Sequence, residues 1–137
     1  MKPVEILLVE DCAGDTLLVS QILKDSAIPV NLHVARDGAQ AMLMLADRDF
    51  QLIILDLNMP GVSGYEVLQR NQSRNIPTVV FTSSSKTSDR EWALVLGARE
   101  YIEKPTDLGL FSEAVRGILE RWVRPEQSAN ASDAAGS

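Results

Sequence analysis

Leu52-Ile53-Ile54-Leu55 is an apolar run of four residues that stops abruptly at Asp56. A strand that is covered by helices on both faces has no side in water, so its sequence is continuously apolar rather than alternating. Residues 4–9 and 78–82 form two further runs of this kind, both nearly continuous and rich in β-branched side chains. The three runs predict buried strands of a parallel sheet.

Two weaker runs complete a repeating pattern of strand and helix. Residues 31–35 alternate as a strand with one wetter face does, and residues 101–103 form the shortest run. Segments of helical period separate the five runs, at about 24 residues per unit. Five such units with right-handed crossovers predict an α/β fold of the flavodoxin-like, doubly wound (βα)5 type. Its parallel five-stranded sheet is expected to have the strand order 2-1-3-4-5.

Local signals predict where several of the helices begin and end. At three expected helix starts, a capping side chain precedes Glu or Gln by three residues. These are Ser63 with Glu66, Ser88 with Glu91 and, more loosely, Asp37 with Gln40. Gly97 suits the end of the fourth helix, because glycine tolerates a left-handed backbone conformation.

Composition and charge predict one globular domain at residues 1–123 and a flexible tail at residues 124–137. Of the 137 residues, 45% are hydrophobic and 23% charged, which is ordinary for a globular protein. The net charge of -6, without a basic cluster, argues against nucleic-acid binding. A single cysteine, Cys12, and an apolar N-terminal stretch of four residues (6–9) favour a cytoplasmic protein without a membrane segment.

Polar side chains occupy the positions where the predicted strands end. Glu10 and Asp11 follow the first run, Asp56 the third and Lys104 the fifth, while Thr82 closes the fourth. The carboxyl ends of parallel strands meet at one edge of the sheet, and ligands bind there at the switch in strand order. We therefore expect these five side chains to form one site.

The residue types at this edge favour phosphoryl chemistry with a divalent cation. A cluster of carboxylates suits Mg2+, which accepts oxygen ligands and leaves room for a phosphoryl oxygen. Lys104 and Thr82 supply a positive charge and a hydroxyl donor for the phosphoryl group. Asp56, after the central strand, is the expected nucleophile, because carboxylates accept phosphoryl groups as acyl phosphates.

These motifs resemble the receiver domain of two-component response regulators over residues 3–122. Glu10-Asp11 resembles the acidic pair of that family, residues 55–61 its phospho-acceptor motif, and Thr82 and Lys104-Pro105 complete the set in order. The resemblance implies that Asp11, Asp56 and the backbone carbonyl of Asn58 bind Mg2+ directly. Glu10 is then expected to act through a water molecule.

The resemblance also implies the reaction and its consequence. Asp56 is expected to take a phosphoryl group from a sensor histidine kinase, with Lys104 and Thr82 holding the product and a cis bond between Lys104 and Pro105. Thr82 would then move toward the phosphoryl group and Tyr101 would turn inward. The fourth helix, fifth strand and fifth helix would form the output face for an unknown downstream protein or a second copy of the chain.

The chain resembles small stand-alone regulators in two respects, which are the segment after Lys104-Pro105 and the expected lack of an output domain. That group includes regulators paired with phytochrome-type kinases. A DNA-binding output is not expected, because the tail is too short for a helix-turn-helix unit. Asp15 is interpreted as a cap of the first helix, and Cys12 as inert, since a thiol is a poor Mg2+ ligand.

Three alternative functions have weaker support in the sequence. A small aspartyl phosphatase of the haloacid dehalogenase type would need a D-x-D motif where the chain has Asp56-Leu57-Asn58. A flavodoxin-like electron carrier would need a phosphate-binding loop where Glu10 and Asp11 stand. A degenerate receiver that binds partners without phosphorylation is the third. Labelling that depends on Mg2+ would distinguish it from the leading hypothesis.

Overall fold

The computed structural model describes residues 2–59, 61 and 63–123, in which strands and helices alternate strictly. The first six elements are β1 (Val4–Val9), α1 (Ala13–Lys24), β2 (Val30–Ala35), α2 (Gly38–Asp47), β3 (Leu52–Leu55) and α3 (Gly64–Asn71). The last four are β4 (Thr78–Thr82), α4 (Thr87–Val95), β5 (Glu100–Glu103) and α5 (Leu108–Trp122). All five predicted strands are present, and their bounds differ from the predicted runs by at most one residue.

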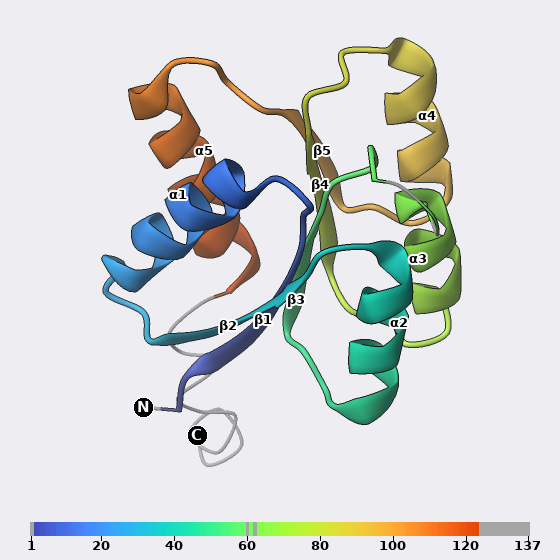
Figure 1. Ribbon diagram of the computed structural model, residues 1–137, viewed down its shortest axis with the longest axis horizontal. Coiled ribbons are helices and arrows are strands. Elements are labelled where there is room, and N and C mark those ends of the chain that lie inside the picture. The colour runs from blue at the N-terminus through green and yellow to red at the C-terminus, as the bar shows by residue number, and fades with distance from the viewer. Residues whose placement is uncertain (1, 60, 62, 124–137) are drawn as a thin grey trace, which may run out of the picture.

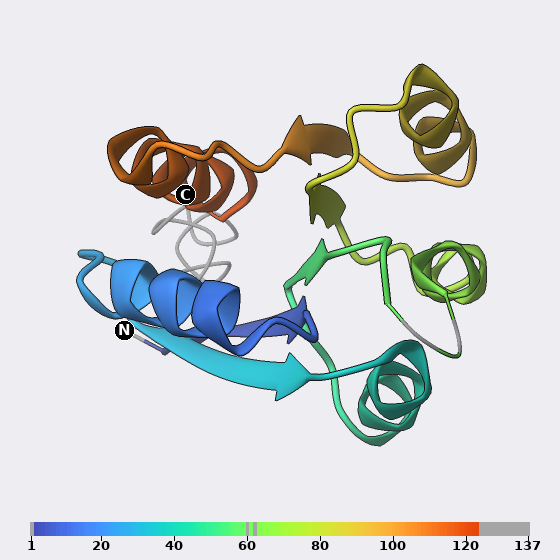
Figure 2. The ribbon, with the colours of Figure 1, turned by 45° about the horizontal axis from the view of Figure 1, so that its top comes forward.

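The five strands form one parallel sheet in the order β2-β1-β3-β4-β5, as predicted. Helices α1 and α5 cover one face of the sheet, and α2, α3 and α4 cover the other (Figures 1 and 2). The flavodoxin-like three-layer architecture predicted from the sequence is therefore confirmed.

Strand β1 shows why a continuous apolar run produces this architecture. Ile6 and Leu8 belong to the core under α1 and α5, whereas Leu7 and Val9 belong to the core under α2, α3 and α4. All four side chains are at most 2% exposed. Residues 6–9 of the strand therefore enter the two hydrophobic cores on alternate sides of the sheet.

The helix ends confirm most of the predicted local signals. The Ser63 side chain accepts a hydrogen bond from Glu66 N, and the Asp37 side chain accepts one from Gln40 N. Gly97 follows the end of α4 with a φ of 109°, a conformation that favours glycine. These contacts place the starts of α2 and α3 and the end of α4 where the sequence predicts them.

The capping box predicted at Ser88 is wrong. Helix α4 begins at Thr87, so Ser88 lies inside its first turn, and Lys86 stands at the N-cap without a side-chain cap bond. Lys86 N instead donates to Ser84 Oγ at 3.2 Å. A hydroxyl in the preceding loop therefore satisfies the backbone at this helix start.

Residues 124–137, predicted to be a flexible tail, lie outside the described residues. None of the helices in the described ranges combines the length and apolar character that a bilayer crossing requires.

Candidate functional site

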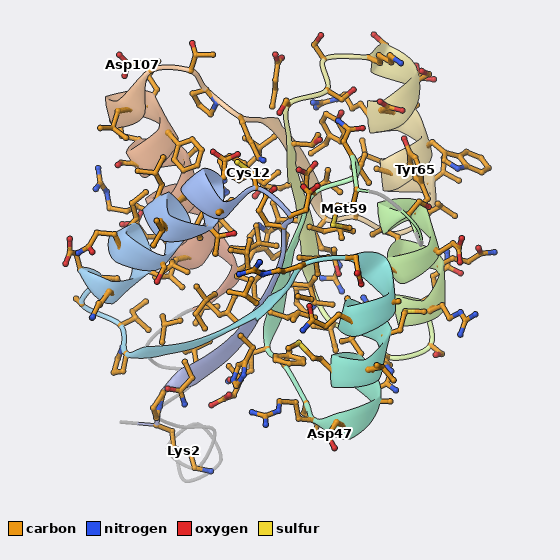
Figure 3. The ribbon with its side chains drawn as sticks, in the orientation of Figure 1. Lys2, Cys12, Asp47, Met59, Tyr65 and Asp107 are labelled. Atoms are coloured by element: carbon orange, nitrogen blue, oxygen red, sulfur yellow. The ribbon has the colours of Figure 1, made fainter. Side chains whose placement is uncertain are left out.

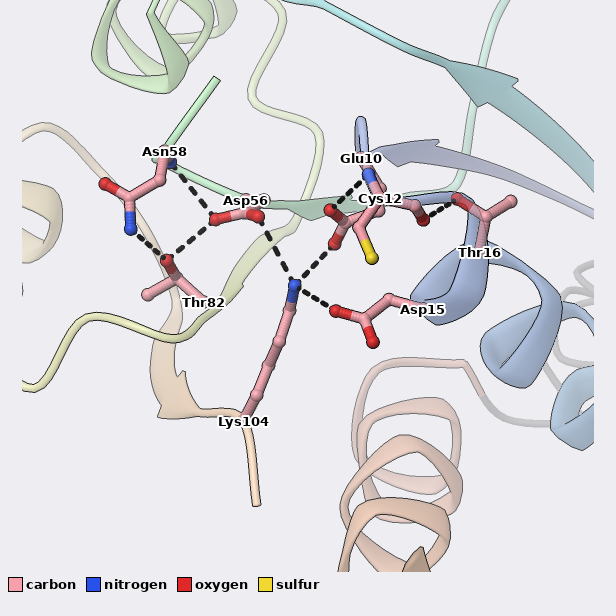
Figure 4. A network of polar contacts seen from close by, with 8 residues as sticks. All are labelled: Glu10, Cys12, Asp15, Thr16, Asp56, Asn58, Thr82 and Lys104. Carbon is pink, nitrogen blue, oxygen red and sulfur yellow. Dashed lines mark hydrogen bonds and ion pairs between the residues drawn. The ribbon is translucent and has the colours of Figure 1, made fainter. Parts of the chain in front are cut away.

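Most of the predicted site residues lie together at the carboxyl edge of the sheet, as Figure 4 shows for Glu10, Asp56, Asn58, Thr82 and Lys104. Val9 of β1 is in register with Leu55 of β3, so the residues that follow these strand ends are neighbours. Lys104 N donates to the Thr82 carbonyl at 2.7 Å, which places the end of β5 beside the end of β4. Strand register therefore gathers side chains that are separated by more than 90 positions in the sequence.

Three carboxylates form an acidic cluster at this edge. Glu10, Asp11 and Asp56 each place one oxygen within 4.8 Å of the other two. Glu10 and Asp56 are only 3% and 6% exposed, whereas Asp11 is open to solvent. Burial, assisted by the charge of Asp56, raises the pKa of Glu10 to about 7, against hydrogen bonds from Lys104 and Cys12 N that lower it. The cluster therefore favours a positive charge in its midst.

Lys104 supplies such a charge within the protein itself. Its Nζ lies 2.7 Å from Glu10 Oε1, 2.8 Å from Asp15 Oδ2 and 3.3 Å from Asp56 Oδ2. Burial acts to lower the pKa of Lys104. Its bonds to Asp15 and Glu10 and the charge of Asp56 outweigh burial and raise that pKa above its usual value. A charged ammonium thus bridges three carboxylates.

The interpretation of Asp15 as a helix cap is wrong. The N-cap of α1 is Cys12, and Asp15 lies in the first turn with its carboxylate on Lys104. This turn faces the carboxyl edge of the sheet, so its acidic side chain reaches the lysine. No local pattern signals this contact, because Lys104 lies 89 positions away from Asp15 in the sequence.

The Asp56 carboxylate is held on both of its oxygens. Thr82 Oγ1 donates to Oδ1 at 2.7 Å, Asn58 N donates to the same oxygen at 3.1 Å, and Oδ2 faces Lys104. Asn58 Nδ2 in turn donates to Thr82 Oγ1 at 3.4 Å. Because the hydroxyl of Thr82 is fully buried, this carboxylate has a defined orientation at the end of β3.

The start of α3 packs directly against the backbone of Asp56. A Cβ atom on Gly64 would lie 2.8 Å from the Asp56 carbonyl oxygen and 2.9 Å from Leu57 Cα. Only a residue without a side chain allows this approach. Gly64 therefore fixes the distance between helix α3 and the strand end that carries the central carboxylate.

Tyr101 lies inward, with 8% of its surface exposed. Its hydroxyl donates to the Ser84 carbonyl at 2.8 Å, and the Arg90 guanidinium lies 6.0 Å from the ring centroid. The inward orientation expected after phosphorylation is thus present together with the bond between Thr82 and Asp56.

The peptide bond between Lys104 and Pro105 is trans, so the prediction of a cis bond here is wrong. The trans form is the more stable one by about 0.5–1 kcal/mol for bonds that precede proline. Lys104 reaches its three carboxylates from this backbone conformation, so its orientation does not require a cis bond.

A pocket of about 400 Å3 opens beside Lys104, between α1 and the segment that joins β5 to α5. Asp15 and Ser83 contribute polar atoms to its wall, and Leu18, Leu108 and Phe111 contribute apolar ones. Lys104 and Asp15 can therefore be approached from this side.

A sheet of this order with an acidic cluster, a lysine and a threonine at its carboxyl edge is the arrangement expected of a receiver domain. The model of the response regulator receiver domain matches residues 6–116, and the chain belongs to this family.

Individual relatives agree with this assignment. Response regulator Rcp1 of Synechocystis sp. is 36% identical over 132 residues, which cover 88% of this chain and 90% of Rcp1. The crystal structure of Mn(2+)-bound Rcp1 matches with a TM-score of 0.83 and 35% identity, covering 90% of this chain and 96% of that one. The phosphorylated cyanobacterial phytochrome response regulator RcpA also has a TM-score of 0.83, at 33% identity, covering 89% and 95% of the two chains.

Longer proteins match over the same region. The transcriptional regulatory protein CpxR of Klebsiella pneumoniae is 33% identical over 130 residues, which cover 93% of this chain but 55% of CpxR. The chain thus spans about half the length of such relatives. The family match favours neither a phosphatase nor an electron carrier.

Proposed function

We propose that the chain is a response regulator that accepts a phosphoryl group on Asp56 from a sensor histidine kinase and then switches its protein contacts. The observation that carries the proposal is the environment of Asp56. Its carboxylate lies in an acidic cluster, and Thr82 Oγ1, Asn58 N and Lys104 Nζ all contact it. These groups are the ones that a phosphoryl acceptor requires.

In the proposed reaction, a carboxylate oxygen of Asp56 attacks the phosphorus of a phosphohistidine. The new O–P bond forms as the P–N bond breaks, and the imidazole leaves with that electron pair and then takes up a proton. Lys104 balances part of the negative charge, and the Thr82 hydroxyl, already on Oδ1, can donate to a phosphoryl oxygen. The chain itself thus promotes only its own phosphorylation and dephosphorylation.

The acidic cluster fits Mg2+ as the cofactor. Carboxylates and a backbone carbonyl are oxygen donors of the kind that Mg2+ prefers, and three carboxylates together need a positive charge. Asp11, Asp56 and the carbonyl of Asn58 would hold the ion, with Glu10 acting through water. When bound, the ion supplies charge neutralisation for the transferred phosphoryl group. The Mn(2+)-bound form of Rcp1 supports a divalent cation here.

The proposed phosphoryl donor is a sensor histidine kinase that meets this chain in the cytoplasm, and the relatives support one class of such kinases. RcpA is named as a phosphorylated phytochrome response regulator, which favours a phytochrome-type histidine kinase as the donor for this chain.

The output surface proposed for the phosphorylated protein is formed by α4, β5 and α5. Trp92 and Val95 on α4 are 53% and 71% exposed, so this helix offers apolar side chains to a downstream protein or a second copy. Sedimentation with and without beryllofluoride, a phosphoryl mimic, distinguishes these partners. A mass increase on adding the mimic indicates dimerisation, and an unchanged mass indicates a different protein.

Labelling with acetyl phosphate tests the proposed reaction. The wild-type protein should gain one phosphoryl group in the presence of Mg2+ and none after chelation. Asp56→Asn should abolish labelling, whereas Asp47→Asn, at an exposed position on α2, should leave it unchanged. Undiminished labelling of Asp56→Asn would contradict the proposal, and an unlabelled wild-type protein would favour a phosphorylation-independent binding receiver.

A further inference from the structure

Asp89 of α4 joins three segments of the protein through its carboxylate. Tyr65 of α3 donates its hydroxyl to Oδ1 at 2.5 Å, and Ser84 of the loop between β4 and α4 donates its hydroxyl to Oδ2 at 2.5 Å. Figure 3 shows Tyr65 on the α3–α4 side of the molecule. Each carboxylate oxygen therefore holds one hydroxyl from a different element.

The ionisation states suit these two bonds. Hydrogen bonds from Ser84 and Tyr65 lower the pKa of Asp89, and burial together with the Asp89 bond raises the pKa of Tyr65. A carboxylate and a neutral phenol are therefore present at neutral pH. Bonds from hydroxyls to an ionised carboxylate are about twice as strong as those between neutral groups.

Asp89 is connected to Asp56 by two routes. On one side, Tyr65 follows Gly64, the glycine that packs against the Asp56 carbonyl. On the other, Ser84 lies two residues beyond Thr82, whose hydroxyl bonds the Asp56 carboxylate at 2.7 Å. A closed ring of contacts thus runs from the acceptor through α3, α4 and the loop back to the acceptor.

Ser84 also connects this ring to Tyr101. Its carbonyl accepts the Tyr101 hydroxyl at 2.8 Å, while its own hydroxyl accepts from Lys86 N at 3.2 Å and donates to Asp89. If Asp89 were absent, the loop could rotate and the acceptor for Tyr101 would move with it.

We propose that Asp89 is a positioning residue that acts through Ser84. It holds the loop at residues 83–86 in the arrangement that keeps Thr82 on Asp56 and Tyr101 inward. This inference rests on the proposed role of Asp56. We call the bonds of Tyr65 and Ser84 to Asp89 the tether. Loss of the tether lowers the fraction of molecules in this arrangement, and the apparent affinity for a phosphoryl mimic falls by the same factor.

The affinity for beryllofluoride in the presence of Mg2+, measured by calorimetry, tests the proposal. Asp89→Asn, Ser84→Ala and Tyr65→Phe should each weaken binding about three- to tenfold, since each removes one strong bond of the tether. Ser84→Thr keeps a hydroxyl at this position, so this variant should retain the wild-type affinity.

Two control variants lie in the same segments. Ser85→Ala changes an exposed hydroxyl one position along the loop, and Glu91→Gln changes an exposed carboxylate on α4. Both should bind the mimic as the wild type does. The NMR signal of a ring-labelled Tyr101 should shift in the three tether variants and stay in place in both controls.

The outcomes separate this inference from the proposed function. A wild-type protein that fails to bind beryllofluoride refutes the proposed function. If the wild type binds and the tether variants bind within twofold of it, the positioning role is overturned. Urea unfolding of each variant completes the test, because lower stability with unchanged affinity and an unchanged Tyr101 signal means that the cluster serves stability alone.

Discussion

Replacement of Gly64 by alanine should damage both the stability and the chemistry of the protein. The added Cβ would lie 2.8 Å from the Asp56 carbonyl oxygen and 2.9 Å from Leu57 Cα. Non-bonded carbon atoms sit about 3.5–4.0 Å apart, so α3 and the end of β3 must separate by about 0.6 Å or more. Both contacts are with backbone, which cannot move aside as a flexible side chain can.

The expected loss of stability follows from this overlap. Overpacking of a tight contact costs about 1–3 kcal/mol, and the better helix propensity of alanine returns at most about 1 kcal/mol. We therefore expect Gly64→Ala to lower the free energy of unfolding by about 1–2 kcal/mol. Displacement of the Asp56 backbone should also slow labelling by acetyl phosphate by about tenfold, because phosphoryl transfer depends on positioning.

Gly14→Ala is the matched control. Gly14 also lies in the first turn of a helix, but the nearest atom to its added Cβ is Cys12 Sγ at 4.0 Å. This variant should be as stable as the wild type or more stable by up to about 1 kcal/mol. Urea unfolding followed by circular dichroism measures both variants. Equal stability and equal labelling for Gly64→Ala and Gly14→Ala would refute the close approach of α3 to Asp56.

Three further predictions concern the polar contacts. Lys104→Met should destabilise the protein by about 3–5 kcal/mol in the presence of a chelator, because it leaves buried carboxylates uncompensated. Excess Mg2+ should restore part of that stability in urea titrations, and no restoration would contradict a cation site at these carboxylates. Thr82→Val keeps the shape of the side chain but removes the hydroxyl that donates to Asp56. The affinity for beryllofluoride should therefore fall several-fold, and the free energy of unfolding should fall by about 1 kcal/mol. An unchanged affinity would mean that Thr82 is not part of the site. The folded-state pKa of Asp89 is lowered, so its stabilisation is complete above the unfolded value of 3.8 and disappears as pH falls through the lower folded value. The stability difference between wild type and Asp89→Asn should therefore be constant from pH 5 to 7 and shrink below about pH 4, and a difference that grows on acidification would oppose this assignment.

The sequence predicts the sheet and the edge at which polar residues gather, because both follow from simple periodic patterns. The continuous apolar runs at β1, β3 and β4 require cover on both faces, and the strand order then brings Asp56, Thr82 and Lys104 to one edge. The carboxylate cluster could thus be located before any distance was known.

Features that depend on side-chain direction were harder to predict. Asp15 resembles a helix cap in the sequence, but the first turn of α1 faces the strand ends and its carboxylate reaches Lys104. The tether at Asp89 needs three elements to converge, and the spacing of Tyr65, Ser84 and Asp89 shows no local pattern. The Ser88 capping box failed because the Ser84 hydroxyl accepts from the Lys86 backbone and α4 begins at Thr87, ahead of Ser88.

Identification of the phosphorylated residue tests the central proposal most directly. Protein treated with acetyl phosphate and Mg2+ is reduced with borohydride, which converts an aspartyl phosphate to homoserine, and the peptides are then sequenced by mass spectrometry. We expect homoserine at position 56, with Asp11 and Asp15 unmodified. Homoserine at another aspartate with position 56 unchanged would contradict it.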